Sequence, residues 1–123
     1  MPVIDGLPLL SAGVYAGAPE EDLTPWLGVD AVVFGSPETV VATALRLSGA
    51  CRRVDAVTPG AASAVPVTLR RILRERRDVR LTTLTEIACV AGIERLEIVL
   101  LRNTHTGRIS AIEAAALFLL SGA

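Results

Sequence analysis

The chain has 123 residues, of which 51% are hydrophobic and 3% aromatic, and its formal net charge is −1. This length fits one domain, residues 1–123, whose core needs neither disulfides nor a structural metal. The charge excludes a dedicated binder of nucleic acid or anionic membranes, which carries a basic excess. No apolar run reaches the roughly 18 residues of a membrane span and no signal peptide opens the chain, so we expect a soluble protein of the bacterial cytoplasm.

The first half of the chain alternates strand and helix signals. Residues 7–15 are typical of a strand with small side chains, and a Gly-Ala-Pro break and a short acidic helical turn follow. Residues 29–34 are a β-branched strand. Ser36, Pro37 and Glu38 supply an N-cap, a proline at the first helical position and an early acid, so the sequence predicts a helix from Pro37 to about Ser48.

The second half begins with a predicted strand at 53–57 and a turn at 58–60. Proline is tolerated in the first turn of a helix but not in its interior, so the next helix should start near Pro66. Arginines occupy most of the solvent-exposed face of this predicted helix. Residues 79–88 and 96–102 predict an antiparallel pair of strands joined around Gly92. The tail, residues 109–120, is apolar enough to be either a helix or a last strand.

The residues that several common metal, nucleotide and catalytic sites require are missing from the sequence. His105 is the single histidine and is expected in an exposed turn, so a multi-histidine metal site is excluded. Cys51 and Cys89 lack metal-ligand spacing and are expected to be reduced and half-buried. The glycine signatures of nucleotide sites and of α/β-hydrolases are missing. The arginines of residues 70–80 could hold an anion or RNA, but the lack of aromatic stacking partners favours a solvated helix face.

From residue 58 onward the chain resembles the C-terminal half of the small trimeric bacterial chorismate mutases, over about 60 residues. The matching positions are those of a turn, a helix and a hairpin: Thr58, Pro59, Pro66, Arg71, Leu73, Glu86, Ile87, Val90, Gly92, Val99, Leu100, Leu101 and Thr104. The resemblance implies an α+β fold in which a ferredoxin-like sheet is backed by two helices, with clefts between the subunits of a trimer.

The resemblance also implies a site for a dianionic substrate, held by convergent arginines and a glutamate. By position Glu86 is that glutamate and Arg71 a peripheral arginine. Tyr15 falls near the position of the first-strand arginine, and Glu97 near that of the hairpin arginine. Because an acid there repels a carboxylate, mutase activity requires Arg80, Arg95 or Arg102 as a substitute.

Two other families leave the function open. Rid-type imine deaminases share the implied fold, and Arg80 and Glu97 are placed like their carboxylate anchor and water-orienting acid. A surface salt bridge across the hairpin explains the same pair. The stretch 54–86 and the tail 113–117 also look like part of a ketosynthase, with glycine at position 60 where the nucleophilic cysteine would fall. That alternative implies a non-catalytic partner in acyl or polyketide assembly.

The sequence therefore predicts an enzyme or ligand-binding protein for a compact carboxylate-bearing metabolite, with isomerase, imine hydrolase and pseudoenzyme as the options. The expected catalytic residues are Glu86 and Glu97, and the expected substrate-binding residues are Arg71, Arg80, Arg102 and Tyr15. No cofactor and no metal are expected. The expected partners are copies of the chain in a trimer and the small-molecule ligand, without nucleic acid or membrane.

Overall fold

The computed structural model describes residues 13–120, which form eight strands in two sheets and two α-helices. Neither helix within this range has the length and apolarity that a membrane crossing requires. The strands are β1 (Val14–Ala16), β2 (Asp30–Phe34), β3 (Arg53–Val57), β4 (Val79–Thr82), β5 (Thr85–Ala91), β6 (Ile98–Asn103), β7 (Ile109–Glu113) and β8 (Ala116–Leu119). The helices are α1 (Pro37–Leu47) and α2 (Val67–Arg74), and two 3-10 turns are η2 (Thr24–Trp26) and η3 (Ala62–Ala64).

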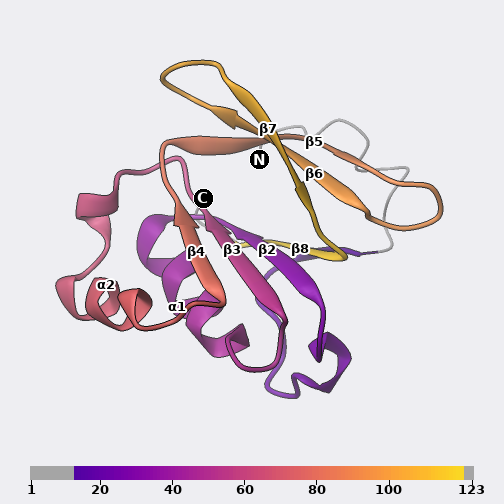
Figure 1. The fold of residues 1–123 in the computed structure, drawn as a ribbon, viewed down its shortest axis with the longest axis horizontal. Helices are drawn as coiled ribbons and strands as arrows, with labels where there is room; N and C mark the ends of the chain where they lie inside the picture. The colour runs from indigo at the N-terminus through magenta and orange to yellow at the C-terminus, as the bar shows by residue number, and fades with distance from the viewer. Residues whose placement is uncertain (1–12, 121–123) are drawn as a thin grey trace.

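The larger sheet is parallel, and its five strands follow the order β1-β8-β2-β3-β4 (Figure 1). The chain leaves β2 through α1 to reach β3, and then passes through α2 to β4. It returns to the other side of β2 only at β8, after the whole second sheet has been built. The boundary between β2 and β8 is therefore the place where the winding of the sheet changes direction.

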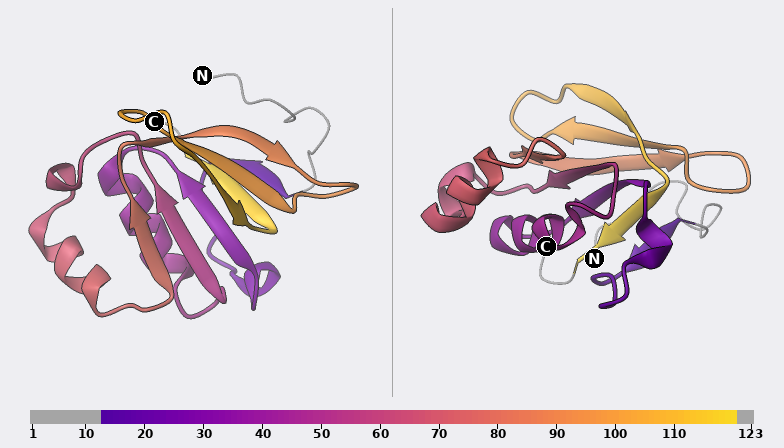
Figure 2. Two further views of the ribbon diagram at one scale, coloured as in Figure 1. Left: turned by 45° about the horizontal axis from the view of Figure 1, so that its top comes forward. Right: turned by 60° about the horizontal axis from the view of Figure 1, so that its bottom comes forward.

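The smaller sheet, β5-β6-β7, is antiparallel and lies across the face of the parallel sheet that is opposite α1 (Figure 2). Its inner rows pair Val90 with Val99 and Val99 with Ile112, and these side chains are buried. On the outer face, Cys89 pairs with Leu100 and Leu100 with Ala111. The molecule thus has three layers, with the parallel sheet in the middle.

Strand β2 packs against both outer layers, the α1 side and the antiparallel sheet. Its side chains alternate between two cores, because successive residues of a strand point to opposite faces. Ala31 and Val33 pack in the core that contains α1, whereas Val32 and Phe34 pack in the core shared with the antiparallel sheet. Such burial on both faces is typical of parallel sheets and gives a continuous apolar run.

Helix α1 begins and ends where the sequence predicts. Pro37 takes the first position after the N-cap Ser36, and Ser48 is the C-cap. The predicted start of α2 near Pro66 is also confirmed, because Pro66 is its N-cap. The strand predictions at 29–34 and 53–57 and the antiparallel pairing around Gly92 are confirmed as well.

The predicted fold class, an α+β chorismate-mutase-like fold with a ferredoxin-like sheet backed by two helices, is wrong. Most of the sheet is parallel, and the stretch 79–88 is not one strand. Leu84, whose φ is 53°, turns the chain so that β4 ends in the parallel sheet and β5 starts the antiparallel sheet.

The tail, residues 109–120, forms two strands, β7 and β8, which lie in different sheets. The strand predicted at 7–15 lies partly outside the described residues, and β1 begins at Val14. The acidic turn is replaced by η2 at Thr24–Trp26.

A buried carboxylate ties the two sheets together. Asp55 on β3 is 0% exposed, and it accepts hydrogen bonds from Nε of Arg53 at 3.0 Å and Nε of Arg80 at 2.9 Å. Arg53 also donates to the carbonyl oxygen of Glu113 at the end of β7. The carboxylate therefore fixes a guanidinium that reaches from the parallel to the antiparallel sheet.

We expect Asp55→Asn to lower the free energy of unfolding by about 2–3 kcal/mol, because it removes the charge that holds two guanidinium groups. The matched control is Glu86→Gln, which breaks the ion pair between Glu86 and Arg102. The side chains of this pair are 50% and 43% exposed, so the loss of the pair should cost less than about 1 kcal/mol. Urea unfolding followed by circular dichroism measures both values, and equal losses would contradict the role of Asp55.

A second carboxylate joins the end of α1 to the start of β4. Asp78 accepts hydrogen bonds from Oγ of Ser48 at 2.8 Å and from the backbone N–H of Gly49 at 3.0 Å. Partial burial raises the pKa of Asp78, but these hydrogen bonds outweigh it and hold the pKa below its usual value. A carboxyl group whose pKa is lower in the folded than in the unfolded chain stabilises the fold above its unfolded pKa.

The contribution of Asp78 should therefore be complete above about pH 5 and be lost as the pH falls through its folded pKa, below about 3.9. We expect Asp78→Asn to be less stable than the wild type at neutral pH, and the difference to shrink in acid. Thermal unfolding at a series of pH values tests this. A difference that is constant with pH would show that the charge of Asp78 plays no part.

Candidate functional site

The carboxyl edge of the parallel sheet is the first place to look for a site. In open α/β sheets, ligands bind outside the carboxyl ends of the strands, at the point where the winding changes direction. Here that point lies between β2 and β8. The residues that follow these strands are Gly35, Ser36 and Pro37 after β2, and Leu120 after β8.

The start of α1 at this edge offers little to an anion. A helix N-terminus binds phosphate through free backbone N–H groups and its positive dipole end. Pro37 has no N–H, and Glu38 adds a negative charge in the first turn. The hydroxyl of Ser36 donates to Oγ1 of Thr39 at 2.7 Å, so it is directed to a neighbouring side chain. The helix start is stabilised internally, and a phosphate would meet a carboxylate there.

The loops around this helix start are closely packed. A Cβ added to Gly60, in the loop after β3, would lie 2.4 Å from Cγ of Pro37, and one added to Gly35 would lie 3.0 Å from Cβ of Leu120. The β3 loop is also tied to the second sheet, because the N–H of Leu84 donates to the carbonyl of Gly60 at 3.0 Å. The proline ring and Leu120 therefore fill space next to the two glycines.

This architecture is a Rossmann-like fold with an antiparallel sheet on one face of the parallel sheet. The computed fold is similar to the thioredoxin reductases from Streptococcus pyogenes MGAS5005 (TM-score 0.83, 18% identity, 99% of this chain and 40% of that chain) and T. acidophilum (TM-score 0.84, 15% identity, 98% and 39%). It is also similar to the atypical thioredoxin reductase TRi from Desulfovibrio vulgaris Hildenborough (TM-score 0.77, 22% identity, 100% and 40%). The chain thus spans about two fifths of the length of these structures. No family model and none of the curated proteins matches it.

These similarities overturn the predicted family and function. The resemblance to chorismate mutases and Rid-type deaminases is wrong, and so are the isomerase and ketosynthase interpretations. The matched positions were prolines, a hairpin glycine and strand aliphatics. Turns and strands of any α/β protein need the same residues, so they carried no information about which strands pair. The predicted trimer and carboxylate ligand are not tested and stay predictions.

The residues at the carboxyl edge do not fit a dinucleotide. The fingerprint of such sites is G-x-G-x-x-G directly after the first strand, in which the second glycine lets the backbone approach the pyrophosphate. Its three glycine positions fall on Gly35, Pro37 and Val40. Pro37 brings a ring against Gly60, and Val40 is 0% exposed in the core. Only the first glycine is kept.

The acid that normally binds the ribose is also missing. It is expected about 20 residues after the fingerprint, at the end of the second strand. The acid in that sequence position is Asp55, but it lies inside β3, is 0% exposed and is bonded to Arg53 and Arg80. The strand ends instead on Val57 and the buried Thr58.

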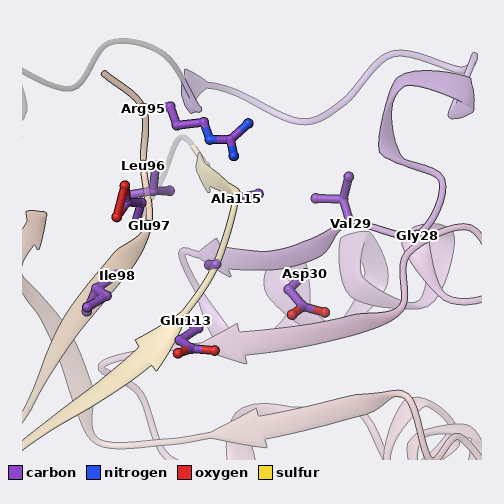
Figure 3. Close-up of a pocket in the computed structure, with 10 residues that line it drawn as sticks. Gly28, Val29, Asp30, Arg95, Leu96, Glu97, Ile98, Glu113 and Ala115 are labelled. Atoms are coloured by element: carbon purple, nitrogen blue, oxygen red, sulfur yellow. The ribbon is translucent and has the colours of Figure 1, made fainter. Parts of the chain in front are cut away.

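A hollow of about 500 Å³ lies at the opposite, amino edge of the parallel sheet (Figure 3). In the view of Figure 3, the carboxylates of Asp30 and Glu113 lie on one side of Ala115 and the guanidinium of Arg95 on the other. Hydrogen bonding from Arg52 lowers the pKa of Asp30. Within residues 13–120, no group of three or more His, Cys, Asp or Glu could hold a metal ion. Of the acids at this edge, Asp30 forms an ion pair, with Arg52.

The predicted site residues are dispersed over the molecule. Glu86 and Arg102 form an ion pair of 3.2 Å on the outer face of the antiparallel sheet. Arg80 pairs with Asp55 and not with Glu97, which lines the amino-edge hollow. The remaining two lie elsewhere: Arg71 on the exposed side of α2, and Tyr15 in an aromatic cluster with Trp26 and Phe118. The structure brings together two of the predicted site residues, Glu86 and Arg102, and does not form the salt bridge considered between Arg80 and Glu97. The roles of all six residues stay predictions.

The residues that sequence reasoning missed are Pro37, Gly60 and Leu120. A signal for the first was present, because Gly35 follows a β-branched strand and precedes a helix. That context is the one in which a glycine fingerprint is expected, so its absence at Pro37 and Val40 could have been noticed. No local signal could have found Gly60 or Leu120, because their contacts are set by the order of the strands.

The two thiols are far apart in the architecture. Cys51 is buried in the core on the α1 side, whereas Cys89 points outward from the antiparallel sheet. Burial, with nearby Asp30 and Asp78, raises the pKa of Cys51 to about 11. Thiol–disulfide exchange by an enzyme needs a thiolate and a second thiol within bonding reach. Cys51 does not supply the thiolate, and the two cysteines lie in different layers of the structure.

We expect Cys51 to stay unmodified by Ellman's reagent near pH 8 in the folded chain, because roughly one thiol in a thousand is ionised there. Cys89, which is half-buried, should react. The variant Cys89→Ser should therefore lose the native labelling, and Cys51→Ser should keep it. Labelling of both variants in denaturant provides the control, and rapid native labelling of Cys89→Ser would contradict the buried position of Cys51.

Proposed function

We propose that this chain is a non-catalytic protein-binding domain built on the fold of a dinucleotide-dependent oxidoreductase. The observation that carries the proposal is Pro37, which stands in the second glycine position of the fingerprint and packs against Gly60. The similar solved structures are thioredoxin reductases and a bacillithiol disulfide reductase, which supports an origin among such enzymes. The chemistry of those enzymes has no matching residues in this domain.

Hydride transfer requires a bound nicotinamide cofactor, and the phosphate-binding features that would hold it are replaced. Pro37 removes an N–H donor, Glu38 adds a carboxylate, and Thr58 stands where the ribose acid is expected. Disulfide reduction by thiol exchange is not supported by Cys51 and Cys89, which lie in different layers. What remains of the ancestral domain is its fold and its surfaces.

The surfaces support a binding role. The outer face of the antiparallel sheet has an aliphatic middle row of Cys89, Leu100 and Ala111. Ile98 and Ile109, at its two ends, are 36% and 50% exposed. Antiparallel sheets that face water usually carry polar residues on that side. An exposed aliphatic row flanked by the Glu86–Arg102 ion pair is typical of the apolar centre and polar rim of a surface that contacts another protein.

We expect NADPH and NADH to show no saturable binding to the chain up to roughly 1 mM. The variant Pro37→Gly/Glu38→Gln restores a backbone N–H and removes a carboxylate, so it should bind NADPH more tightly than the wild type. Isothermal titration calorimetry measures both. The matched control is Pro25→Gly/Glu21→Gln, which makes the same changes at two exposed positions between β1 and β2 and should behave as the wild type.

A dissociation constant for NADPH below about 0.1 mM in the wild type would contradict the proposal. Such a result would mean that the cofactor approaches this edge without the glycine-rich turn. Equal affinities in the Pro37 and Pro25 variants would show that the block lies outside the helix start.

A further inference from the structure

The strongest concentration of charge lies on and directly after α2. Residues 70–77 contain one acid, Glu75, and five arginines, although the whole chain has a net charge of −1. The arginines are Arg70, Arg71, Arg74, Arg76 and Arg77. The four ion pairs within residues 13–120 use other arginines, at positions 52, 53, 80 and 102. The five arginines of this positive patch therefore form no ion pair in the described part of the chain, although Arg76 donates a hydrogen bond to Oγ of Ser48 at 3.3 Å.

The geometry of α2 turns part of this charge into a stripe. Val67, Arg70, Arg71 and Arg74 follow the i, i+3, i+4, i+7 spacing of one helix face, and they line a hollow of about 160 Å³. The opposite side of the helix packs on the core through Leu69 and Leu73. We call the four residues at 67, 70, 71 and 74 the α2 stripe.

The α2 stripe has an unsatisfied donor. Nε of Arg70 is buried and has no hydrogen-bond partner among residues 13–120. Buried polar atoms are nearly always hydrogen-bonded, so such an atom indicates a missing partner. Like charges three and four residues apart also destabilise a helix by about 0.2–0.5 kcal/mol per pair. An oxyanion in the hollow would relieve the repulsion between the arginines that line it, and a guanidinium is the group best suited to bind carboxylates.

We propose that the α2 stripe is the docking site for an acidic, partly aliphatic segment of a partner protein. The proposal rests on the protein-binding function above and names the chemistry of the partner. Two aliphatic side chains lie among the arginines and are open to contact, because Val67 is 60% and Ile72 39% exposed. Aliphatic contacts beside charge-assisted hydrogen bonds are typical of recognition of a peptide.

Nucleic acid fits this surface less well. Base recognition on single strands uses aromatic side chains as stacking platforms. Tyr15, Trp26 and Phe118 are packed against one another in a cluster, and Phe34 is buried between the sheets. The observations therefore favour an acidic peptide.

The test is fluorescence anisotropy of the chain with a short labelled peptide rich in Glu with interspersed Leu. The variant Arg71→Gln/Arg74→Gln should weaken binding about tenfold or more, because two charge-assisted contacts are lost. The matched control is Arg95→Gln/Arg108→Gln, which removes two exposed charges from loops of the antiparallel sheet. Glutamine keeps helix propensity, and circular dichroism checks that each variant is folded.

The variant Arg71→Glu/Arg74→Glu should bind the peptide in which Lys replaces Glu, and the wild type should not. Equal weakening in the α2 and loop variants would reduce the binding to non-specific charge and overturn the proposal. Tighter binding of a single-stranded oligonucleotide or of phosphatidylserine vesicles would overturn it as well, as would no binding at all. NADPH titration is read separately, so failure of the α2 stripe and failure of the non-catalytic domain are distinguishable.

Discussion

Burial of β2 on both faces is the constraint on which the rest of the structure depends. One five-residue strand supplies Ala31 and Val33 to the α1 core and Val32 and Phe34 to the core under the antiparallel sheet. Each fully buried valine contributes about 1.5–3 kcal/mol, so neither layer can be lost without exposing a face of the central strand. The buried Asp55 on the adjacent strand then fixes how the two sheets are joined, because its partner Arg53 reaches the end of β7.

The closed carboxyl edge follows from this arrangement. Strand β8 pairs with β2, so the residue that leaves β8, Leu120, lies directly beside Gly35. Strand β3 pairs with β2 on the other side, which brings Gly60 against Pro37. In a dinucleotide site these same neighbours would leave room for a pyrophosphate. The topology that would create a site is retained here, and the side chains at its edge occupy the space.

Local features of this fold could be predicted from the sequence, and its topology could not. Ser36 with Pro37 and the position of Pro66 fixed both helix starts, because capping and proline geometry act within a few residues. The pairing of β8 between β1 and β2 joins residues about 85–100 positions apart, and no period of hydrophobicity encodes it. For the same reason the sequence predicts a single strand over 79–88, because its apolar pattern continues through Leu84, where the chain changes sheets. The candidate site could not be predicted for the same reason. Arg80 pairs with Asp55 on the neighbouring strand β3, although Glu97 is closer to Arg80 in the sequence.

Pro37 stabilises the start of α1 and opposes phosphate binding at the same place. Proline at the first helical position fixes φ at a helical value and loses nothing to the helix, since its N–H would have no partner within the helix. Glu38 adds favourable interaction with the helix dipole. Both residues stabilise α1 and both oppose a phosphate at the same place, so stability and dinucleotide binding make opposite demands on this turn. A domain that binds no phosphate there is free to meet the first demand alone. Its largest group of arginines outside ion pairs then lies on and after α2, where Nε of Arg70 is buried without a partner among residues 13–120.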